Sequence, residues 1–196
     1  MRIIKSVAVI MVGLAVSLGC DPIDDTGETA MAGTLDDDGS PDDDGDGNAD
    51  GPANEDPFGA VTAHNNVRAS AQPTPQPSLP PVAWDDDLAD VAQQLADACV
   101  FAHSGNEFGE NIYVGTGTPS ATDAITAWAD EILVYDYPSN GCAGVCGHYT
   151  QLVWRDTTRI GCAFADCDTV GGIDFAGRLW VCNYDPPGNF VGQHPY

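Results

Sequence analysis

The sequence predicts an α+β domain that is stabilised by disulfides and follows an acidic N-terminal segment. Apolar residues recur at helical spacing in three segments, residues 58–67, 88–99 and 120–132. Short runs that are typical of strands occupy residues 109–114, 159–164 and 178–184. Six of the 7 cysteines lie beyond residue 98, and an even set is expected for disulfides in an oxidising compartment.

The charge of the chain excludes one class of partner. The 196 residues carry a formal net charge of −24. Fourteen of the acidic residues precede Phe58, and sixteen follow it against four arginines. Because nothing basic is available to neutralise phosphates, we expect no nucleic-acid partner.

The N-terminus has the three parts of a secretory signal peptide, which we assign to residues 1–19. Its apolar run is too short for a transmembrane helix. Gly19-Cys20 resembles a bacterial lipoprotein processing site, although Ser17 stands where leucine is usual. The alternative is an ordinary cleaved signal with an incidental cysteine. Removing Cys20 leaves an even set of cysteines, which favours lipidation of Cys20 and a membrane contact through this anchor alone.

Residues 20–57 are predicted to be a lipidated cysteine followed by an acidic disordered linker. The segment has too few apolar residues to bury, and its aspartates repel one another. Fragments within residues 36–48 resemble calcium loops but lack the closing glutamate and the flanking helices. An extended tether is the preferred interpretation.

The first helical pattern places His64 on an apolar face, with Arg68 one turn away. The second pattern runs from Leu88 to Cys99 and is the clearest in the chain. Acidic residues 85–87 precede it, where they would cap the helix and favour its positive end. We expect this second helix to be purely structural.

Two carboxylates stand out, Glu110 where a side chain can point into a cleft and Glu131 where burial requires a partner. Glu110 lies at the junction between a turn and the strand 109–114. Ser120 opens the third helix, and Glu131 falls at the edge of its apolar face. A salt bridge to one of the few arginines is the structural alternative for Glu131.

Gly147 to Trp154 is the stretch with the densest polar chemistry. It combines His148, a phenol, a hydroxyl and a carboxamide with a short apolar run. A hydrogen-bonded core network around a structural histidine is one interpretation, and a binding site is the other. Cys142 and Cys146, just upstream, could close a small loop on themselves. Strands 159–164 and 178–184 are expected to be antiparallel neighbours.

The domain resembles the CAP superfamily (cysteine-rich secretory proteins, antigen 5, pathogenesis-related 1), in particular its plant pathogenesis-related type. The matching motifs cover nearly all of residues 58–196, in the order of the family. They are His64-Asn65-Asn66-Val67-Arg68, His103-Ser104, Gly109-Glu110-Asn111-Ile112, Trp128-x-x-Glu131, Cys146 to Trp154, and Cys182 to Asn189.

The resemblance implies a three-layer α-β-α sandwich with a small antiparallel sheet. It also implies the disulfides Cys99–Cys167, Cys142–Cys146 and Cys162–Cys182, where the sequence alone leaves fifteen pairings open. The cleft tetrad of the family, two histidines and two glutamates, falls on His64, Glu110, Glu131 and His148. Such a set suits Zn²⁺ or another divalent cation, without an organic cofactor.

Two functions follow from the resemblance. The first is a secreted, envelope-anchored module that binds a sterol, another lipid or a cell-surface protein. The alternative is a metal-dependent, protease-like hydrolase with Glu110 or Glu131 as general base. Ser104 is a weak candidate nucleophile, and a surface module without a small ligand is a third interpretation. The C-terminal segment resembles a plant peptide signal, and we treat it as structural.

Overall fold

The computed structural model describes residues 56–196, so the predicted signal peptide, Cys20 and nearly all of the linker lie outside the described residues. The helices are α1 (Ala60–Ser70), α2 (Asp86–Asp97), α3 (Ala121–Ala129), η1 (Asp130–Val134) and α4 (Gly147–Leu152). The strands are β1 (Ala83–Trp84), β2 (Gly109–Gly115), β3 (Tyr135–Asp136), β4 (Gly141–Cys142), β5 (Arg159–Val170) and β6 (Phe175–Asp185). Within this part of the chain, no helix is long and apolar enough to cross a membrane.

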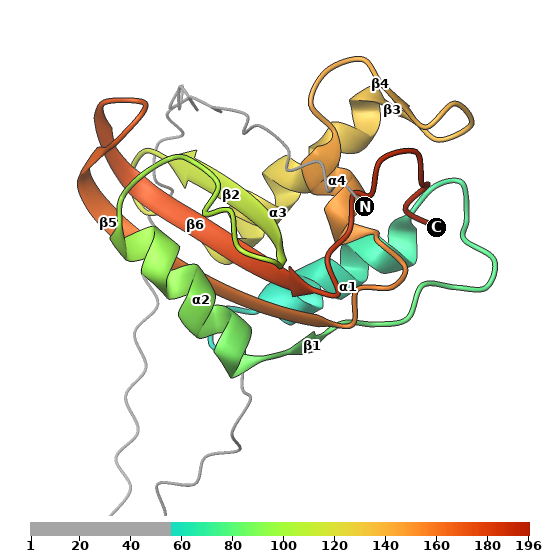
Figure 1. The fold of residues 1–196 in the computed structure, drawn as a ribbon, viewed down its shortest axis with the longest axis horizontal. Helices are drawn as coiled ribbons and strands as arrows, with labels where there is room; N and C mark the ends of the chain where they lie inside the picture. The colour runs from blue at the N-terminus through green and yellow to red at the C-terminus, as the bar shows by residue number, and fades with distance from the viewer. Residues whose placement is uncertain (1–55) are drawn as a thin grey trace, which may run out of the picture. The chain divides into compact units, whose positions relative to one another are not determined.

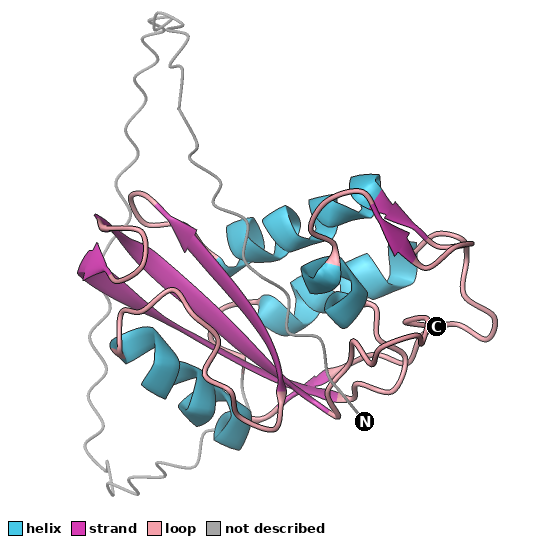
Figure 2. Ribbon diagram, turned by 45° about the horizontal axis from the view of Figure 1, so that its top comes forward, coloured by secondary structure: helices cyan, strands magenta, loops and turns pink. Residues whose placement is uncertain are grey.

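A four-stranded sheet in the order β1-β5-β6-β2 separates two helical layers, which confirms the predicted sandwich. β5, β6 and β2 are antiparallel, and β1 adds a short parallel edge. Helix α2 covers one face of the sheet, while α1, α3 and α4 cover the other (Figures 1 and 2). Each face has its own apolar core, one built around Trp180 and Tyr184 and the other around Val181 and Leu179.

The predicted first helix begins at Ala60, two residues after Phe58. The side chain of Asp56 accepts hydrogen bonds from the backbone N–H groups of Phe58 (3.0 Å) and Val61 (2.7 Å). The bond from Val61 satisfies one of the donors that a helix start leaves unpaired, and the bond from Phe58 fixes the chain just before the helix. His64 is buried on the inner face of α1, as the spacing of apolar residues predicts.

Helix α2 starts as predicted, because the side chain of Asp85 accepts a hydrogen bond from Leu88 N at 3.0 Å. It ends earlier than predicted, at Asp97. Cys99 has a positive φ of 51° and lies beyond the helix. The helix packs very closely on β5, since a Cβ atom added to Gly161 would stand 2.1 Å from Ala89 N.

The third helical pattern is split between α3 and η1. Ser120 and Asp123 form a capping box at its start, with Asp123 N donating to Ser120 Oγ at 3.2 Å. The α-helix ends at Ala129, and the chain tightens into the 3₁₀ turn η1. Glu131 therefore lies on η1 and not on the predicted α-helix, and its carboxylate is directed toward α4.

All three disulfides form as the resemblance implies, between Cys99 and Cys167, Cys142 and Cys146, and Cys162 and Cys182. The two strands predicted near the C-terminus pair as antiparallel neighbours, and both are longer than predicted. The irregular end of the chain is held by side-chain and backbone hydrogen bonds. Gln151 Oε1 accepts from Gly188 N at 2.9 Å, and Arg155 N donates to Pro195 O at 2.8 Å.

Candidate functional site

His64 is the first member of a buried chain of hydrogen bonds. Its Nδ1–H donates to Ala60 O at 2.7 Å, which leaves Nε2 to accept from Tyr184 Oη–H at 2.9 Å. Asn111 Nδ2 donates to Tyr184 Oη (3.1 Å) and to His148 O (3.2 Å). Burial lowers the pKa of His64 to about 4 and raises the pKa of Tyr184 well above its usual value. Both groups are therefore neutral near pH 7.

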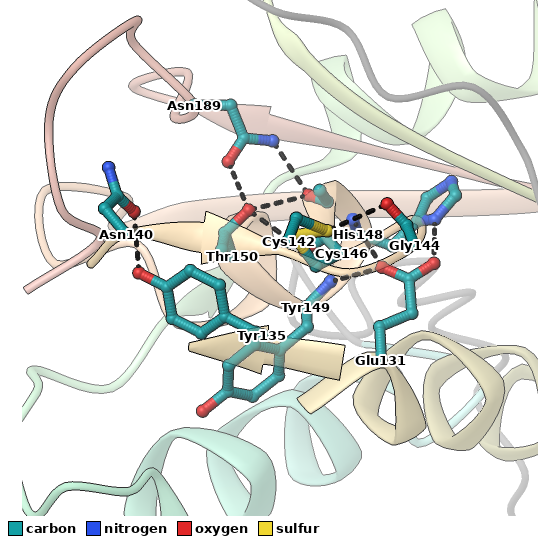
Figure 3. Close-up of a disulfide and its surroundings, with 11 residues drawn as sticks. Glu131, Tyr135, Asn140, Cys142, Gly144, Cys146, His148, Tyr149, Thr150 and Asn189 are labelled. Atoms are coloured by element: carbon teal, nitrogen blue, oxygen red, sulfur yellow. Dashed lines mark hydrogen bonds and ion pairs between the residues drawn. A yellow bond between two sulfur atoms is a disulfide. The ribbon is translucent and has the colours of Figure 1, made fainter. Parts of the chain in front are cut away.

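His148 and Glu131 form the second buried unit. The carboxylate of Glu131 accepts from His148 Nδ1 at 2.6 Å and from the backbone N–H groups of His148 (2.9 Å) and Tyr149 (3.1 Å). The ring of His148 also stacks on Trp128, with centroids 6.1 Å apart. Glu131 thus pairs with a histidine and not with an arginine. It fixes both the ring and the first turn of α4 (Figure 3).

Arg68 fixes the other end of α4. Its guanidinium donates to four backbone carbonyls, those of Pro80 (2.9 Å), Leu152 (2.9 Å), Trp154 (2.8 Å) and Thr157 (3.4 Å). Burial lowers the pKa of Arg68 to about 10. The arginine one turn from His64 is therefore a structural tie between α1 and the end of α4.

Glu110 belongs to a different network. It accepts hydrogen bonds from His103 Nδ1 (2.7 Å), from the Ser104 backbone N–H (3.0 Å) and from Ser104 Oγ. Burial raises the pKa of Glu110, but the hydrogen bonds from His103 and Ser104 outweigh burial and hold this pKa below its usual value. Successive side chains of a strand alternate between faces, so Glu110 shares its face with Ile112, which packs in the core beside α2.

The four tetrad residues therefore do not converge in this arrangement. His64, His148 and Glu131 lie on the face of α1, α3 and α4, while Glu110 is held by the 103–104 turn. Among the residues that the structure describes, no group of three or more His, Cys, Asp or Glu side chains is placed to hold a metal ion. His148 Nε2 is buried and has no hydrogen-bond partner, whereas His64 Nε2 is occupied by Tyr184. The donor set does not fit a zinc site with four protein ligands.

The hydroxyl of Ser104 is directed at a carboxylate. It donates to Glu110, which also accepts from His103. A serine nucleophile needs a base that takes its proton and an oriented partner for that base. Here the His103 and Ser104 side chains both donate to the Glu110 carboxylate, so these hydrogen bonds hold the 103–110 turn in place.

A cleft of about 410 Å³ lies beside α4. One wall is the β3–β4 ribbon, residues 135–142, together with the disulfide loop 142–146. The opposite wall is the C-terminal strap, which we define as residues 188–196. We call the space between them the ribbon cleft. Its lining includes Tyr135, Asn140, Cys142, Gly144, Val145, Cys146, Gly147, Thr150, Trp154, Asn189, Phe190, Val191, Gly192, Gln193 and Pro195. Figure 3 labels some of these residues, among them Tyr135, Asn140 and Asn189.

Hydrogen bonds join the two walls of the ribbon cleft. Asn140 Nδ2 donates to Gln193 O at 2.8 Å, and Tyr135 Oη donates to Asn140 Oδ1 at 2.8 Å. At the floor, Thr150 Oγ1 donates to Asn189 Oδ1 at 2.7 Å, while Asn189 Nδ2 donates to Gly147 O at 2.8 Å. No residue in the lining carries a formal charge.

Sequence reasoning missed the ribbon cleft and two members of the buried network, Asn111 and Tyr184. Both residues stand inside motifs that the resemblance uses, beside Glu110 and Cys182. Their polarity within apolar strands was the available signal, because a buried phenol or amide requires a partner.

Comparison with known proteins agrees with the resemblance to the CAP superfamily. Residues 61–184 match the model of the CAP, or cysteine-rich secretory protein, family. Pathogenesis-related protein 1A of Nicotiana tabacum is 43% identical over 143 residues, which cover 69% of this chain and 78% of the relative. Pathogenesis-related protein 1 of Arabidopsis thaliana is 41% identical over 140 residues, covering 69% and 80%.

Solved structures show the same fold. Venom allergen-like protein 4 of Schistosoma mansoni is similar with a TM-score of 0.53 and 27% identity, over 70% of this chain and 90% of that one. The crystal structure of NaASP2 with Zn²⁺ is similar with a TM-score of 0.55 and 27% identity, over 70% and 82%. The family description supports secretion. On sequence, disulfides and fold, the chain belongs to the CAP, or cysteine-rich secretory protein, family.

Proposed function

We propose that this protein is a secreted binding module that holds a neutral, largely apolar molecule, such as a sterol or another uncharged lipid, in the ribbon cleft. The observation that carries the proposal is the lining of this cleft. A volume of about 410 Å³ lies in the range typical of small-molecule sites. Its walls combine Tyr135, Val145, Trp154 and Phe190 with a few amide and hydroxyl groups.

The absence of charged residues from this lining selects the ligand class. Burying an ionised carboxylate or ammonium without a partner is costly. A ligand with a hydroxyl or carbonyl group could instead exchange hydrogen bonds with the amides that line the cleft. We therefore favour a neutral sterol-like or acylglycerol-like molecule over a fatty-acid anion.

The test is binding of Nile red, a neutral apolar fluorophore, to the full chain. We expect saturable binding that cholesterol displaces and that palmitate at pH 8 does not. Val145→Asp places a charge in the lining and is expected to weaken binding by about tenfold or more. Val100→Asp is the matched control, since Val100 is exposed and outside the cleft. Equal binding by both variants, or displacement by palmitate alone, would refute the assignment.

Zinc binding at the tetrad remains a prediction, and it requires His64 to leave Tyr184. Zn²⁺ in the crystal structure of the related NaASP2 supports it. Calorimetric titration of the full chain with ZnCl₂, beside His64→Ala/His148→Ala, tests it. Stoichiometric binding that the double variant loses would support the metal and justify a screen for hydrolysis. Hydrolysis is the weaker candidate, because Ser104 donates to Glu110 and, within residues 56–196, no group of three or more His, Cys, Asp or Glu side chains is placed to hold a metal ion.

Anchoring of the chain to a bacterial envelope through lipidated Cys20 is a further part of the proposal. The processing-site resemblance and the even number of remaining cysteines support it. Expression in a bacterium followed by detergent phase partitioning tests it. We expect the wild-type chain in the detergent phase and Cys20→Ala in the aqueous phase. Wild-type chain in the aqueous phase would show free secretion instead.

A further inference from the structure

The Cys142–Cys146 disulfide differs from the other two in its access to solvent. Cys142 is exposed and Cys146 is partly exposed. Cys162, Cys182 and Cys167 are buried, with exposed fractions of 1%, 1% and 5%, and Cys99 is partly exposed, so that Cys142 is the most exposed of these six cysteines. Thiol–disulfide exchange requires a thiolate to reach a sulfur atom, so exposed disulfides react first. Among the three disulfides, a reductant in solution therefore meets Cys142–Cys146 first.

This disulfide also closes the smallest loop, with a sequence separation of 4 against 20 and 68. A short loop restricts the unfolded chain least, so its bond contributes least to stability through chain entropy. Cleavage is thus expected to leave the fold intact. What changes is local, because both cysteines and two of the residues between them, Gly144 and Val145, line the ribbon cleft.

The bond joins two separately anchored pieces. Cys142 belongs to β4, which pairs with β3 through only two residue pairs. Cys146 directly precedes α4, which Glu131 holds through the backbone N–H groups of His148 and Tyr149. Breaking the bond therefore removes the covalent link between β4 and the start of α4, while the His148–Glu131 pair stays in place (Figure 3).

The reduced form has a hydrogen-bond acceptor in place. Cys142 Sγ lies 3.0 Å from the carbonyl oxygen of Gly144. A disulfide sulfur carries no proton and cannot donate, whereas a thiol donates weakly. The loop can thus satisfy the new Cys142 thiol within the cleft wall, which favours a stable reduced state.

We propose that Cys142–Cys146 is a reducible latch, which keeps the wall of the ribbon cleft closed around its ligand when oxidised and releases the ligand when reduced. The release of a ligand rests on the proposed function. The opening of the cleft wall on reduction does not. The co-reactant is a dithiol. One of its thiolates attacks Cys142 Sγ, the Cys142–Cys146 bond breaks, and a mixed disulfide forms. The second thiol then displaces Cys142, so the dithiol leaves as a disulfide and both cysteines become protonated thiols.

The experiment treats the oxidised full chain with graded dithiothreitol, followed by alkylation and mass mapping of each cysteine. We expect Cys142 and Cys146 to become alkylated at least about tenfold faster than the other four. At that degree of reduction, Nile red affinity should fall about fivefold or more, and reoxidation should restore it. Cys142→Ser/Cys146→Ser is the reference variant, with weak binding that dithiothreitol does not change.

Hydrogen exchange provides a readout that needs no ligand. Reduction should raise exchange in residues 142–146 and 189–193 and leave α2 and β5 unchanged. Earlier reduction of Cys99–Cys167 or Cys162–Cys182, or unchanged affinity and exchange after reduction of Cys142–Cys146, would overturn the latch. If the oxidised chain binds no Nile red, the proposed function fails, and hydrogen exchange alone decides for or against the latch.

Discussion

At the level of single residues, burial determines the protonation of the site. His64 Nδ1 faces a carbonyl that can only accept, so Nε2 must accept the proton of the Tyr184 hydroxyl. A protonated imidazole would place a second donor against that hydroxyl and a charge beside Arg68. The neutral tautomer is thus part of the folded structure.

His64 should therefore make stability depend on pH. Its pKa is 6.5 when unfolded and about 4 when folded, so the unfolded chain binds more protons between these values. The free energy of unfolding should fall as the pH drops from 6.5 to 4, by about 3 kcal/mol in total. Urea titrations of wild type and His64→Gln at pH 7, 6, 5 and 4 measure this. If the free energy of unfolding of His64→Gln depended equally steeply on pH, the pH dependence would belong to other groups.

Glu131 should be the most sensitive residue of the network. Its carboxylate satisfies two backbone N–H groups and the ring of His148. Glu131→Ala leaves these donors buried and unpaired, and should cost about 3 to 5 kcal/mol of unfolding free energy. Glu131→Gln keeps an acceptor and should cost less than half as much. Urea unfolding distinguishes the two, and equal losses would show that only the charge matters.

At the level of elements, α2 lies closer to β5 than the apolar pattern of the helix could predict. The periodicity of residues 88–99 predicts the buried face of the helix but not its distance from the sheet. Gly161 sets that distance, since a Cβ atom there would also stand 2.5 Å from Leu88 C. Strand patterns identify β5 without showing why this position is glycine.

Gly161→Ala should consequently push α2 away from the sheet and destabilise the domain by about 3 kcal/mol. Gly171→Ala is the matched control, because its added Cβ would meet nothing closer than 3.6 Å. Thermal unfolding of both variants is the measurement. Similar melting temperatures would mean that α2 can shift without loss of packing.

At the level of the whole molecule, local patterns predicted the helices, the strands and the polar positions, and the resemblance predicted the layers and the cysteine pairs. His64 and Glu131 could be identified because each stands on an apolar face and needs a partner. The ribbon cleft could not, since its walls are segments as distant as Asn140 and Gln193, which no periodicity relates. The place of Glu110 was equally hidden, because a strand pattern gives alternation but not which face a given residue takes.

The measurement to make first is a map of backbone and imidazole NMR shifts of the full chain during titration with Nile red. If the ribbon cleft is the binding site, the largest changes will occur in residues 140–147 and 189–195. The ring signals of His64 and His148 will change little, because Glu131, Tyr184 and Ala60 hold them independently of the cleft. Changes centred on His64 and His148, with residues 189–195 unaffected, would place the ligand at the tetrad and refute the assignment to the ribbon cleft.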